Sequence, residues 1–342
     1  MSSRDVQRPI CIIGLGLIGG SLLRDLAAQK HDVYGYNHST SGARTAIKQG
    51  YDVSDNLPEL LARAEEEGAM LVLAVPMKAV GEVLDSIQEH APTCGITDVV
   101  SVKTEVRDQV RERGMEDRYV GGHPMAGTAN SGWDHSQTGL FKRAAWAITY
   151  DYATECEAAG KKIDQFWVDL FADVTRMTQM VGAEAIPVRV INHDAAVARI
   201  SHLPHVLAET LAVVGDNGGI LAQSLAAGSF KDGTRVAGTA PALVRQMCET
   251  NSVALVEALD EALELLQEAR DSLAAEKPSI AELADAGYRA RTRIEARSGA
   301  RKESVSPLKI SSRPVLRLHP GAPSWIAQLR QSESLGGRIE IF

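Results

Sequence analysis

Residues 10–20 read Ile-Cys-Ile-Ile-Gly-Leu-Gly-Leu-Ile-Gly-Gly, and the predicted fold class follows from this segment. Its first four residues are apolar without interruption, which is typical of a strand that is buried on both faces. Gly14, Gly16 and Gly19 follow at the spacing G-x-G-x-x-G, and an apolar helical pattern then continues through Leu26. In such a turn the first glycine permits a tight bend, the second lets a ligand approach the backbone, and the third allows close packing of helix on strand.

This strand, turn and helix together predict a binding site for a dinucleotide. The pyrophosphate of a dinucleotide binds at the N-terminus of the helix, where backbone N–H groups point outward. Further contacts are expected where a later apolar run ends, because ligands of such sheets bind at the carboxyl ends of the strands. The residues expected to contact the cofactor are Gly14, Gly16, Leu17, Ile18, Gly19, Val75 and Pro76.

The first half of the chain alternates short apolar runs with stretches of helix length. This alternation predicts an α/β domain of the Rossmann type, with a doubly wound parallel sheet. We expect the NAD(P)-binding domain to cover residues 1–181, with room for one more β-α pair before Val181. The runs expected as strands are residues 10–13, 33–36, 70–75, 96–100 and 144–150.

Residues 182–298 differ in character and predict an all-helical domain, because no strand pattern interrupts them. Their Leu- and Ala-rich faces exceed what one small domain covers by itself, so we expect a homodimer that shares this core. The alternative is a single helical layer packed only on the sheet domain. The apolar helical patterns cover residues 183–214, 251–274 and 281–297.

The last segment, residues 299–342, begins with a polar and basic stretch that is typical of a linker and extends to residue 313. A strand pattern from Val315, a helix pattern from Trp325 and a second strand pattern from Ile339 follow. These patterns predict a short β-α-β tail.

The composition excludes several classes of protein. The 342 residues are 44% hydrophobic and 23% charged, which is typical of a globular chain. The net charge of −8 disfavours sequence-independent binding to nucleic acid, which depends on neutralising phosphates. No apolar run reaches the roughly 18 residues of a membrane span, and the N-terminus has no leader pattern. The four scattered cysteines match no metal or redox spacing, so we expect a cytoplasmic protein without a metal site.

The end of the second predicted strand bears on the choice between NAD and NADP. An NAD-selective domain usually places Asp or Glu there, which binds the ribose 2′-hydroxyl. Here the neutral Asn37 occupies that position, and side chains that can donate to a 2′-phosphate follow it. They favour NADP and leave NAD possible, while an N-cap of the next helix at residues 39–41 is a second role for the hydroxyls. The donors are His38, Ser39, Thr40 and Arg44.

Two polar motifs follow strand-like runs, where doubly wound domains bind their ligands. Residues 98–103 read Asp-Val-Val-Ser-Val-Lys and include Ser101, and residues 121–128 read Gly-Gly-His-Pro-Met-Ala-Gly-Thr and include His123. A histidine between glycines and a proline is poorly suited to core packing. Because an imidazole titrates near neutral pH, such a residue is a candidate for proton transfer to or from a hydroxyl. The alternative is a purely structural histidine.

The helical half contains Ser201-His202-Leu203-Pro204-His205 and, at residues 229–235, Ser-Phe-Lys-Asp-Gly-Thr-Arg. A proline inside an apolar helix removes a backbone donor and frees polar groups nearby. His202 and His205 share a helix face, but no third ligand stands at a suitable spacing, so the sequence does not predict zinc. Arg235 is a candidate for binding a carboxylate, and its alternative role is a surface salt bridge.

Taken in order, GLGLIG, DVVSVK, GHPMAG, SHLPH and FKDGTR resemble the TyrA family of prephenate and arogenate dehydrogenases, over residues 9 to about 295. The resemblance implies an NAD(P) domain, a helical dimerisation domain and a substrate site in the cleft between them. It also implies oxidation of a ring hydroxyl with loss of a carboxylate, so that the ring becomes aromatic.

The resemblance assigns roles to single residues. His123 matches the catalytic base of the family, and Ser101 matches a serine that hydrogen-bonds near the same hydroxyl. Arg235 matches the arginine that binds a substrate carboxylate. The remaining residues that it implies on the substrate side are Ser201, His205 and Thr128.

Two departures from the family pattern bear on the substrate. Thr128 is followed by Ala129 where several prephenate-using members have Glu, and Val244 stands where they have Trp. Some arogenate-preferring members resemble this chain at both places, so the comparison leans towards arogenate. The tail from Leu318 resembles the opening β-α-β of an ACT module, although the chain ends before its second half.

Two other functions are weighed against this resemblance. A β-hydroxyacid dehydrogenase also has a GLGxxG domain and a helical dimer domain, but it depends on a lysine in its first long interdomain helix. Residues 183–214 contain no lysine. The second alternative is a non-catalytic NAD(P)-sensing protein, which the clustering of the His123, Ser101 and Arg235 motifs argues against.

Overall fold

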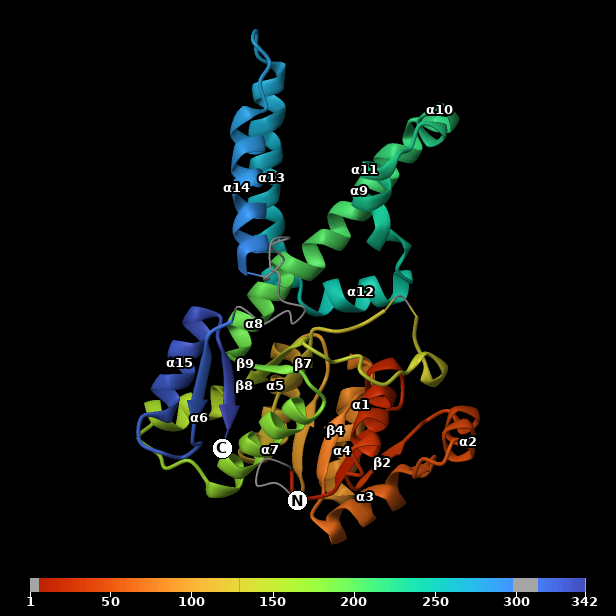
Figure 1. Cartoon of the computed structure of the whole chain (residues 1–342), viewed down its shortest axis with the longest axis vertical. Coiled ribbons are helices and arrows are strands. Elements are labelled where there is room, and N and C mark those ends of the chain that lie inside the picture. The colour runs from red at the N-terminus through yellow and green to blue at the C-terminus, as the bar shows by residue number, and fades with distance from the viewer. Residues whose placement is uncertain (1–5, 129, 298–312, 342) are drawn as a thin grey trace, which may run out of the picture. The chain divides into compact units, whose positions relative to one another are not determined.

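The computed structural model describes residues 6–128, 130–297 and 313–341. They form two compact units. The first contains the described residues up to His193 together with those from Pro314 onward, and the second runs from Asp194 to Arg313. Figure 1 shows both units, with many of their helices and strands labelled.

The first unit is built on a six-stranded parallel sheet. Its strands are β1 (Ile10–Ile13), β2 (Val33–Tyr36), β3 (Val53–Ser54), β4 (Met70–Leu73), β5 (Gly95–Asp98) and β6 (Tyr119–Val120). Their order across the sheet is β3-β2-β1-β4-β5-β6, and every neighbouring pair is parallel. The winding therefore reverses between β1 and β4, which is the position where sheets of this kind bind ligands.

Helices cover both faces of this sheet, which confirms the predicted doubly wound fold (Figure 1). Successive side chains of a strand point to opposite faces. In β1, Ile10 and Ile12 therefore join one buried cluster, and Cys11 and Ile13 join the other. The first cluster packs against α1 (Leu17–Ala28) and α2 (Thr40–Lys48), and the second against α3 (Leu57–Glu67), α4 (Val80–His90) and α5 (Thr104–Glu112).

A second, three-stranded sheet completes the first unit. It contains β7 (Gly122–Pro124), β8 (Ala145–Thr149) and β9 (Glu184–Val188), in the order β7-β8-β9. Strand β7 is antiparallel to β8, and β8 is parallel to β9. Residues 151–181 between β8 and β9 form α6 (Asp151–Ala158) and α7 (Gln165–Met180) rather than a further β-α pair.

Two expectations for this region are wrong. The apolar run at 144–150 belongs to the second sheet and does not extend the first one. Residues 184–188, which the pattern assigned to a helix, form a strand because β8 supplies their backbone hydrogen-bond partners. Pro187 is tolerated there because β9 is an edge strand of its sheet.

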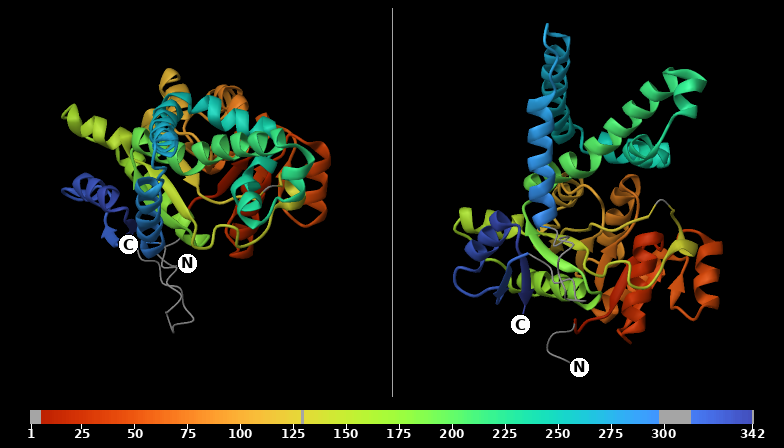
Figure 2. Two further views of the ribbon diagram at one scale, coloured as in Figure 1. Left: turned by 90° about the horizontal axis from the view of Figure 1, so that it is seen from above. Right: turned by 45° about the horizontal axis from the view of Figure 1, so that its top comes forward.

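The C-terminal segment forms β10 (Val315–Leu318), α15 (Trp325–Leu335) and β11 (Arg338–Ile341), and its two strands are parallel. It therefore has the predicted β-α-β order. Helix α15 and strand β11 pack against β9 (Figures 1 and 2). The Trp325 ring is buried beside Phe171 and Trp167 of α7, with ring centroids 5.5 and 6.3 Å away. The predicted linker lies outside the described residues except for residue 313.

In the second unit every regular element of the described residues is a helix, whereas the predicted helical domain, residues 182–298, also included the strand β9. The two longest helices of the second unit, α13 (Ser252–Ala274) and α14 (Ala281–Arg297), run alongside each other and are drawn in shades of blue in Figure 2. Large apolar side chains are exposed along several of these helices, for example Ile220 at 82% and Val253 at 80%. Among the described residues no helix is long and apolar enough to cross a membrane. The helices are α8 (Val190–Val197), which begins in the first unit, α9 (Leu203–Asn217), α10 (Gly219–Ser224), α11 (Gly228–Thr234), α12 (Pro241–Thr250), α13 (Ser252–Ala274) and α14 (Ala281–Arg297).

Trp325→Ala tests how strongly the tail is attached to the first unit. Emptying a buried aromatic site costs about 3–5 kcal/mol, so we expect a loss of this size in the free energy of unfolding. Urea denaturation followed by circular dichroism measures it. Leu335→Ala, at the exposed end of the same helix, is the control and should change stability by less than about 0.5 kcal/mol. Equal effects of the two substitutions would show that the tail is held by other contacts.

Candidate active site

The glycine-rich turn between β1 and α1 has the geometry that a pyrophosphate requires. Gly14 has a φ of 107°, and a Cβ there would lie 2.5 Å from the carbonyl oxygen of Ala74. A Cβ on Gly19 would lie 2.0 Å from the carbonyl oxygen of Gly14. A Cβ on Gly16 would meet nothing within 4 Å, so the space beside the start of α1 is open. Gly16 caps α1 without a side chain, which leaves the first N–H groups of the helix to an anion.

The turn also meets the end of β4, as predicted for a site at the switch point. A Cβ on Gly14 would lie 3.0 Å from Cγ1 of Val75. Pro76 follows, exposed to solvent. The Leu17 side chain is buried and that of Ile18 packs against the first cluster, so both residues have only their backbone to offer to a phosphate.

At the end of β2, Asn37 is 9% exposed and its side chain holds the loop that follows. Its Oδ1 accepts a hydrogen bond from the backbone N–H of Ser39, at 3.0 Å. The hydroxyl of Ser39 in turn accepts from the N–H of Gly42 at 3.2 Å and caps α2, which confirms the N-cap role. The other candidate donors, His38, Thr40 and Arg44, have exposed side chains.

A buried ion pair lies at the end of β5. The side chains of Asp98 and Lys103 have no exposed surface and contact each other. Asp98 also accepts a hydrogen bond from the hydroxyl of Tyr119, at 2.6 Å. Two charges without contact to water are tolerated only when each has good partners, so removal of either one is strongly destabilising.

The same carboxylate holds the backbone beside both candidate catalytic residues. Oδ1 of Asp98 accepts from the N–H of Val100 at 2.8 Å, and Oδ2 accepts from the N–H of Gly122 at 3.3 Å. Val100 directly precedes Ser101, and Gly122 directly precedes His123. One buried side chain therefore ties together the two loops that the sequence singled out.

His123 lies on β7, opposite Ala147 of β8. Its Nδ1 lies 2.9 Å from Nε2 of His193, which is hydrogen-bond distance, and the two rings meet edge to face. His193, at 3% exposure, belongs to the first turns of α8. His193 was not predicted from the sequence. Its signal was a lone imidazole in an apolar helical run, but a partner 70 residues away is not visible in such a pattern.

The segment after His123 is fastened to α1. The hydroxyl of Ser21 accepts from the N–H of Gln137 at 3.0 Å, and Asp25 accepts from the N–H of Gly139 at 2.7 Å. On the same face of α1, Arg24 donates to the hydroxyl of Ser136 and lies over the ring of Trp133, at 4.2 Å. The helix of the dinucleotide turn therefore also supports the segment that contains Thr128. Thr128 itself is exposed, and Ala129 lies outside the described residues.

Three further candidates belong to the second unit. Ser201 lies on a π-helix, Ala198–His202, three residues before Pro204, and its hydroxyl is 3.9 Å from Sδ of Met247. His205 follows on α9, and its Nδ1 is buried without a hydrogen-bond partner among the described residues. Arg235 is exposed and begins a 3-10 helix, Arg235–Gly238, that packs against α9.

His202 has a structural role. It is 1% exposed, and its Nδ1 lies 3.2 Å from Nδ2 of Asn251, which also donates to the carbonyl of Asp194. The part of the chain that the structure describes contains no group of three or more His, Cys, Asp or Glu side chains that could hold a metal ion.

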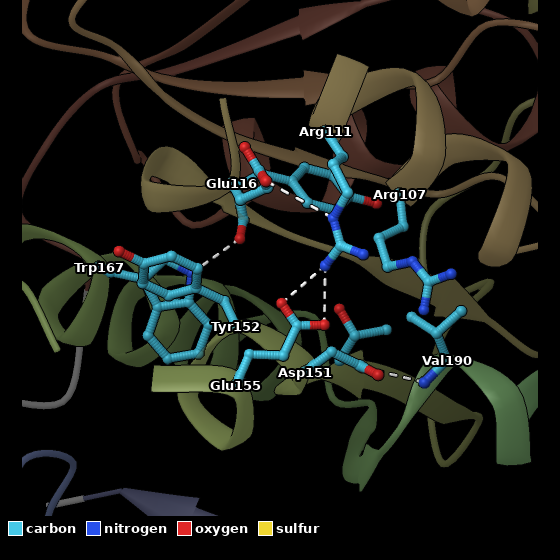
Figure 3. Close-up of a pocket in the computed structure, with 10 residues that line it drawn as sticks. Arg107, Arg111, Glu116, Asp151, Tyr152, Glu155, Trp167 and Val190 are labelled. Carbon is cyan, nitrogen blue, oxygen red and sulfur yellow. Dashed lines mark hydrogen bonds and ion pairs between the residues drawn. The ribbon is translucent and has the colours of Figure 1, made fainter. Parts of the chain in front are cut away.

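A small pocket of the first unit contains none of the predicted site residues (Figure 3). Several charged side chains of this pocket have partners within the protein. Arg111 forms an ion pair with Glu155 at 2.6 Å, and Asp151 accepts a hydrogen bond from the backbone N–H of Val190 at 2.9 Å. Burial raises the pKa of the Asp151 carboxyl, and the hydrogen bond from Val190 opposes that rise.

Asp98→Asn tests the buried pair. The substitution leaves the Lys103 charge without its partner, so the free energy of unfolding should fall by about 3–5 kcal/mol. Asp85→Asn is the control, because it removes a pair with Arg113 at the solvent-exposed surface and should change stability little. Chemical denaturation of both variants measures the difference. Similar small losses in both would contradict the assigned role of Asp98.

Comparisons with known proteins agree with this geometry. Residues 20–175 match the family described as "Prephenate dehydrogenase, nucleotide-binding domain", and residues 190–284 match "Prephenate dehydrogenase, dimerization domain". A cyclohexadienyl dehydrogenase from Zymomonas mobilis is 31% identical over 281 residues, which cover 79% of this chain and 90% of that protein.

Solved structures give the same result. A candidate prephenate dehydrogenase from Corynebacterium glutamicum is 58% identical with a TM-score of 0.91, covering 99% of this chain and 100% of that one. An arogenate dehydrogenase from Synechocystis is 27% identical with a TM-score of 0.68, covering 84% and 99%. The chain therefore belongs to the TyrA family of prephenate dehydrogenases, as the five sequence motifs indicate, and is an NAD(P)-dependent dehydrogenase.

Proposed function

We propose that the protein oxidises and decarboxylates arogenate in preference to prephenate, with NADP used at least as well as NAD. The observation that supports the oxidation itself is the His123–His193 pair, held by the scaffold that also forms the dinucleotide turn, and the neutral Asn37 supports the choice of NADP. The Synechocystis relative is named as an arogenate dehydrogenase. The residues Ala129 and Val244 support the same substrate, as the sequence comparison argued.

In the proposed mechanism His123 accepts the proton of the ring hydroxyl. A neutral imidazole has one donor and one acceptor nitrogen. If Nδ1 of His123 donates to Nε2 of His193, Nε2 of His123 keeps its lone pair and is the nitrogen that accepts the proton. His193 therefore selects the reactive tautomer of His123 and fixes the plane of its ring.

The dinucleotide turn, with open space beside Gly16 and uncapped N–H groups, fits the pyrophosphate of NAD(P). When bound, the nicotinamide supplies the oxidant for the ring carbon. The protein then has to orient base and substrate, because aromatisation and loss of CO₂ supply the driving force.

The remaining roles rest on the family motifs. Ser101 hydrogen-bonds near the reacting hydroxyl and supports His123. Arg235 binds a substrate carboxylate, and an exposed guanidinium is available for such a pair. Three further residues are proposed to line the substrate site, namely Ser201, His205 and Thr128.

Dimerisation through the helical unit is part of the proposal. This unit exposes large apolar side chains, and residues 190–284 match the family described as a dimerization domain. A cytoplasmic location is proposed with it. A β-hydroxyacid dehydrogenase or a non-catalytic sensor predicts a different result in one assay. Only the proposed enzyme forms NAD(P)H when purified protein is given arogenate or prephenate.

His123→Asn should lower kcat by about 10²–10⁴, the usual contribution of general acid–base catalysis, with dinucleotide affinity unchanged. Reduction of NADP followed by absorbance, together with calorimetric titration of the dinucleotide, measures both quantities. His135→Asn, an exposed histidine of the same unit, is the control and should keep full turnover. Full turnover in His123→Asn would remove this residue from the mechanism.

Asn37→Asp should shift cofactor preference towards NAD. The carboxylate keeps the hydrogen bond from Ser39 but repels a 2′-phosphate, at a cost of several kcal/mol where water is excluded. The ratio of kcat/KM for NADP to that for NAD should fall by about tenfold or more. Asn56→Asp makes the same chemical change at the N-cap of α3 and should leave the ratio unchanged. A wild-type enzyme that strongly prefers NAD would contradict the proposed preference.

A further inference from the structure

The N-terminus of α8 is capped by carboxylates from two distant segments. The helix begins where the carbonyl of Arg189 accepts from the N–H of His193, at 2.9 Å. The N–H of Arg189 donates to Glu333 of α15 at 2.9 Å, and the N–H of Val190 donates to Asp151, also at 2.9 Å (Figure 3). Negative groups stabilise a helix N-terminus because its N–H groups have no partner within the helix.

Glu333 makes more hydrogen bonds than capping the N-terminus of α8 requires. It also accepts from Nδ2 of Asn192 at 2.7 Å and from the hydroxyl of Tyr150, and it lies 3.4 Å from Nε of Arg189. Its side chain is 12% exposed. Burial alone would raise the pKa of the carboxyl, but the hydrogen bonds from Arg189, Tyr150 and Asn192 outweigh it and lower the pKa. Glu333 is therefore ionised at neutral pH.

These contacts hold the turn that contains His193. Asn192 directly precedes His193, and the Arg189 carbonyl accepts the His193 N–H. Any displacement of this turn moves the buried imidazole of His193, whose Nε2 lies 2.9 Å from Nδ1 of His123. The contacts thus run without a gap from the C-terminal helix to the candidate base.

A second ion pair of α15 involves α6 rather than α8. Arg330, one helix turn before Glu333, pairs with Glu157 of α6, and both side chains are 45% exposed. If the polar contacts of α15 served only to attach the tail, the two residues would have similar roles. In the described part of the chain, the hydrogen bonds from Arg189 and Asn192 of the α8 turn go to Glu333, whereas Arg330 pairs with α6.

We propose that Glu333 is a positioning residue, which acts through α8 and His193 to set the orientation and tautomer of His123. The proposal rests on the proposed role of His123 as base. It gives the C-terminal β-α-β segment a function within the first unit, as a support of the active site.

Glu333→Gln compared with Arg330→Gln tests this proposal in the full-length protein. A glutamine keeps the size of Glu333 but removes its charge and replaces the acceptor Oε2 with a donor, so Tyr150 and Nε of Arg189 can no longer donate to that position. We expect kcat to fall by about tenfold or more, because small misplacements of catalytic groups cost up to about 10²-fold. The KM values for substrate and dinucleotide should stay within about twofold, and Arg330→Gln should change neither.

A second readout does not depend on turnover. Ring ¹⁵N chemical shifts of labelled histidines report tautomer and hydrogen bonding, and the His123 signal is assigned by its loss in His123→Asn. We expect Glu333→Gln to shift the His123 ring signals and Arg330→Gln to leave them as in the wild type. Asn192→Ala should shift these ring signals in the same direction as Glu333→Gln. The Asn192 side chain is exposed, so we expect this variant to remain folded.

The outcomes separate the two proposals. Loss of kcat with shifted ring signals in Glu333→Gln, and neither change in Arg330→Gln, supports the positioning role. Equal behaviour of these two variants, or unshifted ring signals in Asn192→Ala, overturns it even when His123→Asn is inactive. Full turnover in His123→Asn instead overturns the proposed mechanism, and with it the catalytic meaning of the contacts.

Discussion

At the end of β5 a lysine and an aspartate lie side by side without any contact with water, and the backbone before both Ser101 and His123 is held by this pair. A buried charge is tolerated only when all of its hydrogen-bonding capacity is used. Asp98 meets this requirement by binding Lys103, Tyr119 and two backbone N–H groups. Those N–H groups precede Ser101 and His123, so the demand for partners brings two separate loops to one point.

The rest of the first unit builds on the same edge of the sheet. The carboxyl ends of parallel strands lie together, so the turn at Gly14, the end of β4 and the loop after β5 become neighbours although they are far apart in sequence. Helix α1 serves this edge twice. Its N-terminus is open to a phosphate, while the hydroxyl of Ser21 and the carboxylate of Asp25 hold the segment that follows His123.

The imidazole of His123 is held by different contacts, through His193. His193 is held by the start of α8, and that start is capped from α6 and from the tail helix α15. Packing of Trp325 against Phe171 and Trp167 keeps the tail in place. A short C-terminal β-α-β segment is thereby connected through hydrogen bonds to His123, the proposed base.

The amino-acid sequence alone was sufficient to predict the elements whose requirements are local. A buried strand, a glycine turn and an amphipathic helix depend on neighbouring residues, so the dinucleotide turn and the doubly wound sheet could be predicted from residues 10–20 and the apolar runs. The ordered motifs around Ser101, His123 and Arg235 likewise identified the family. The partners of groups that are distant in sequence are set by the three-dimensional packing of the chain. Residues 184–188 are a strand because β8 lies beside them, and His193 and Glu333 matter because the fold brings them to His123 and α8. Neither a strand's hydrogen-bond partner nor that of an imidazole is encoded in adjacent residues, and no periodicity could have revealed them.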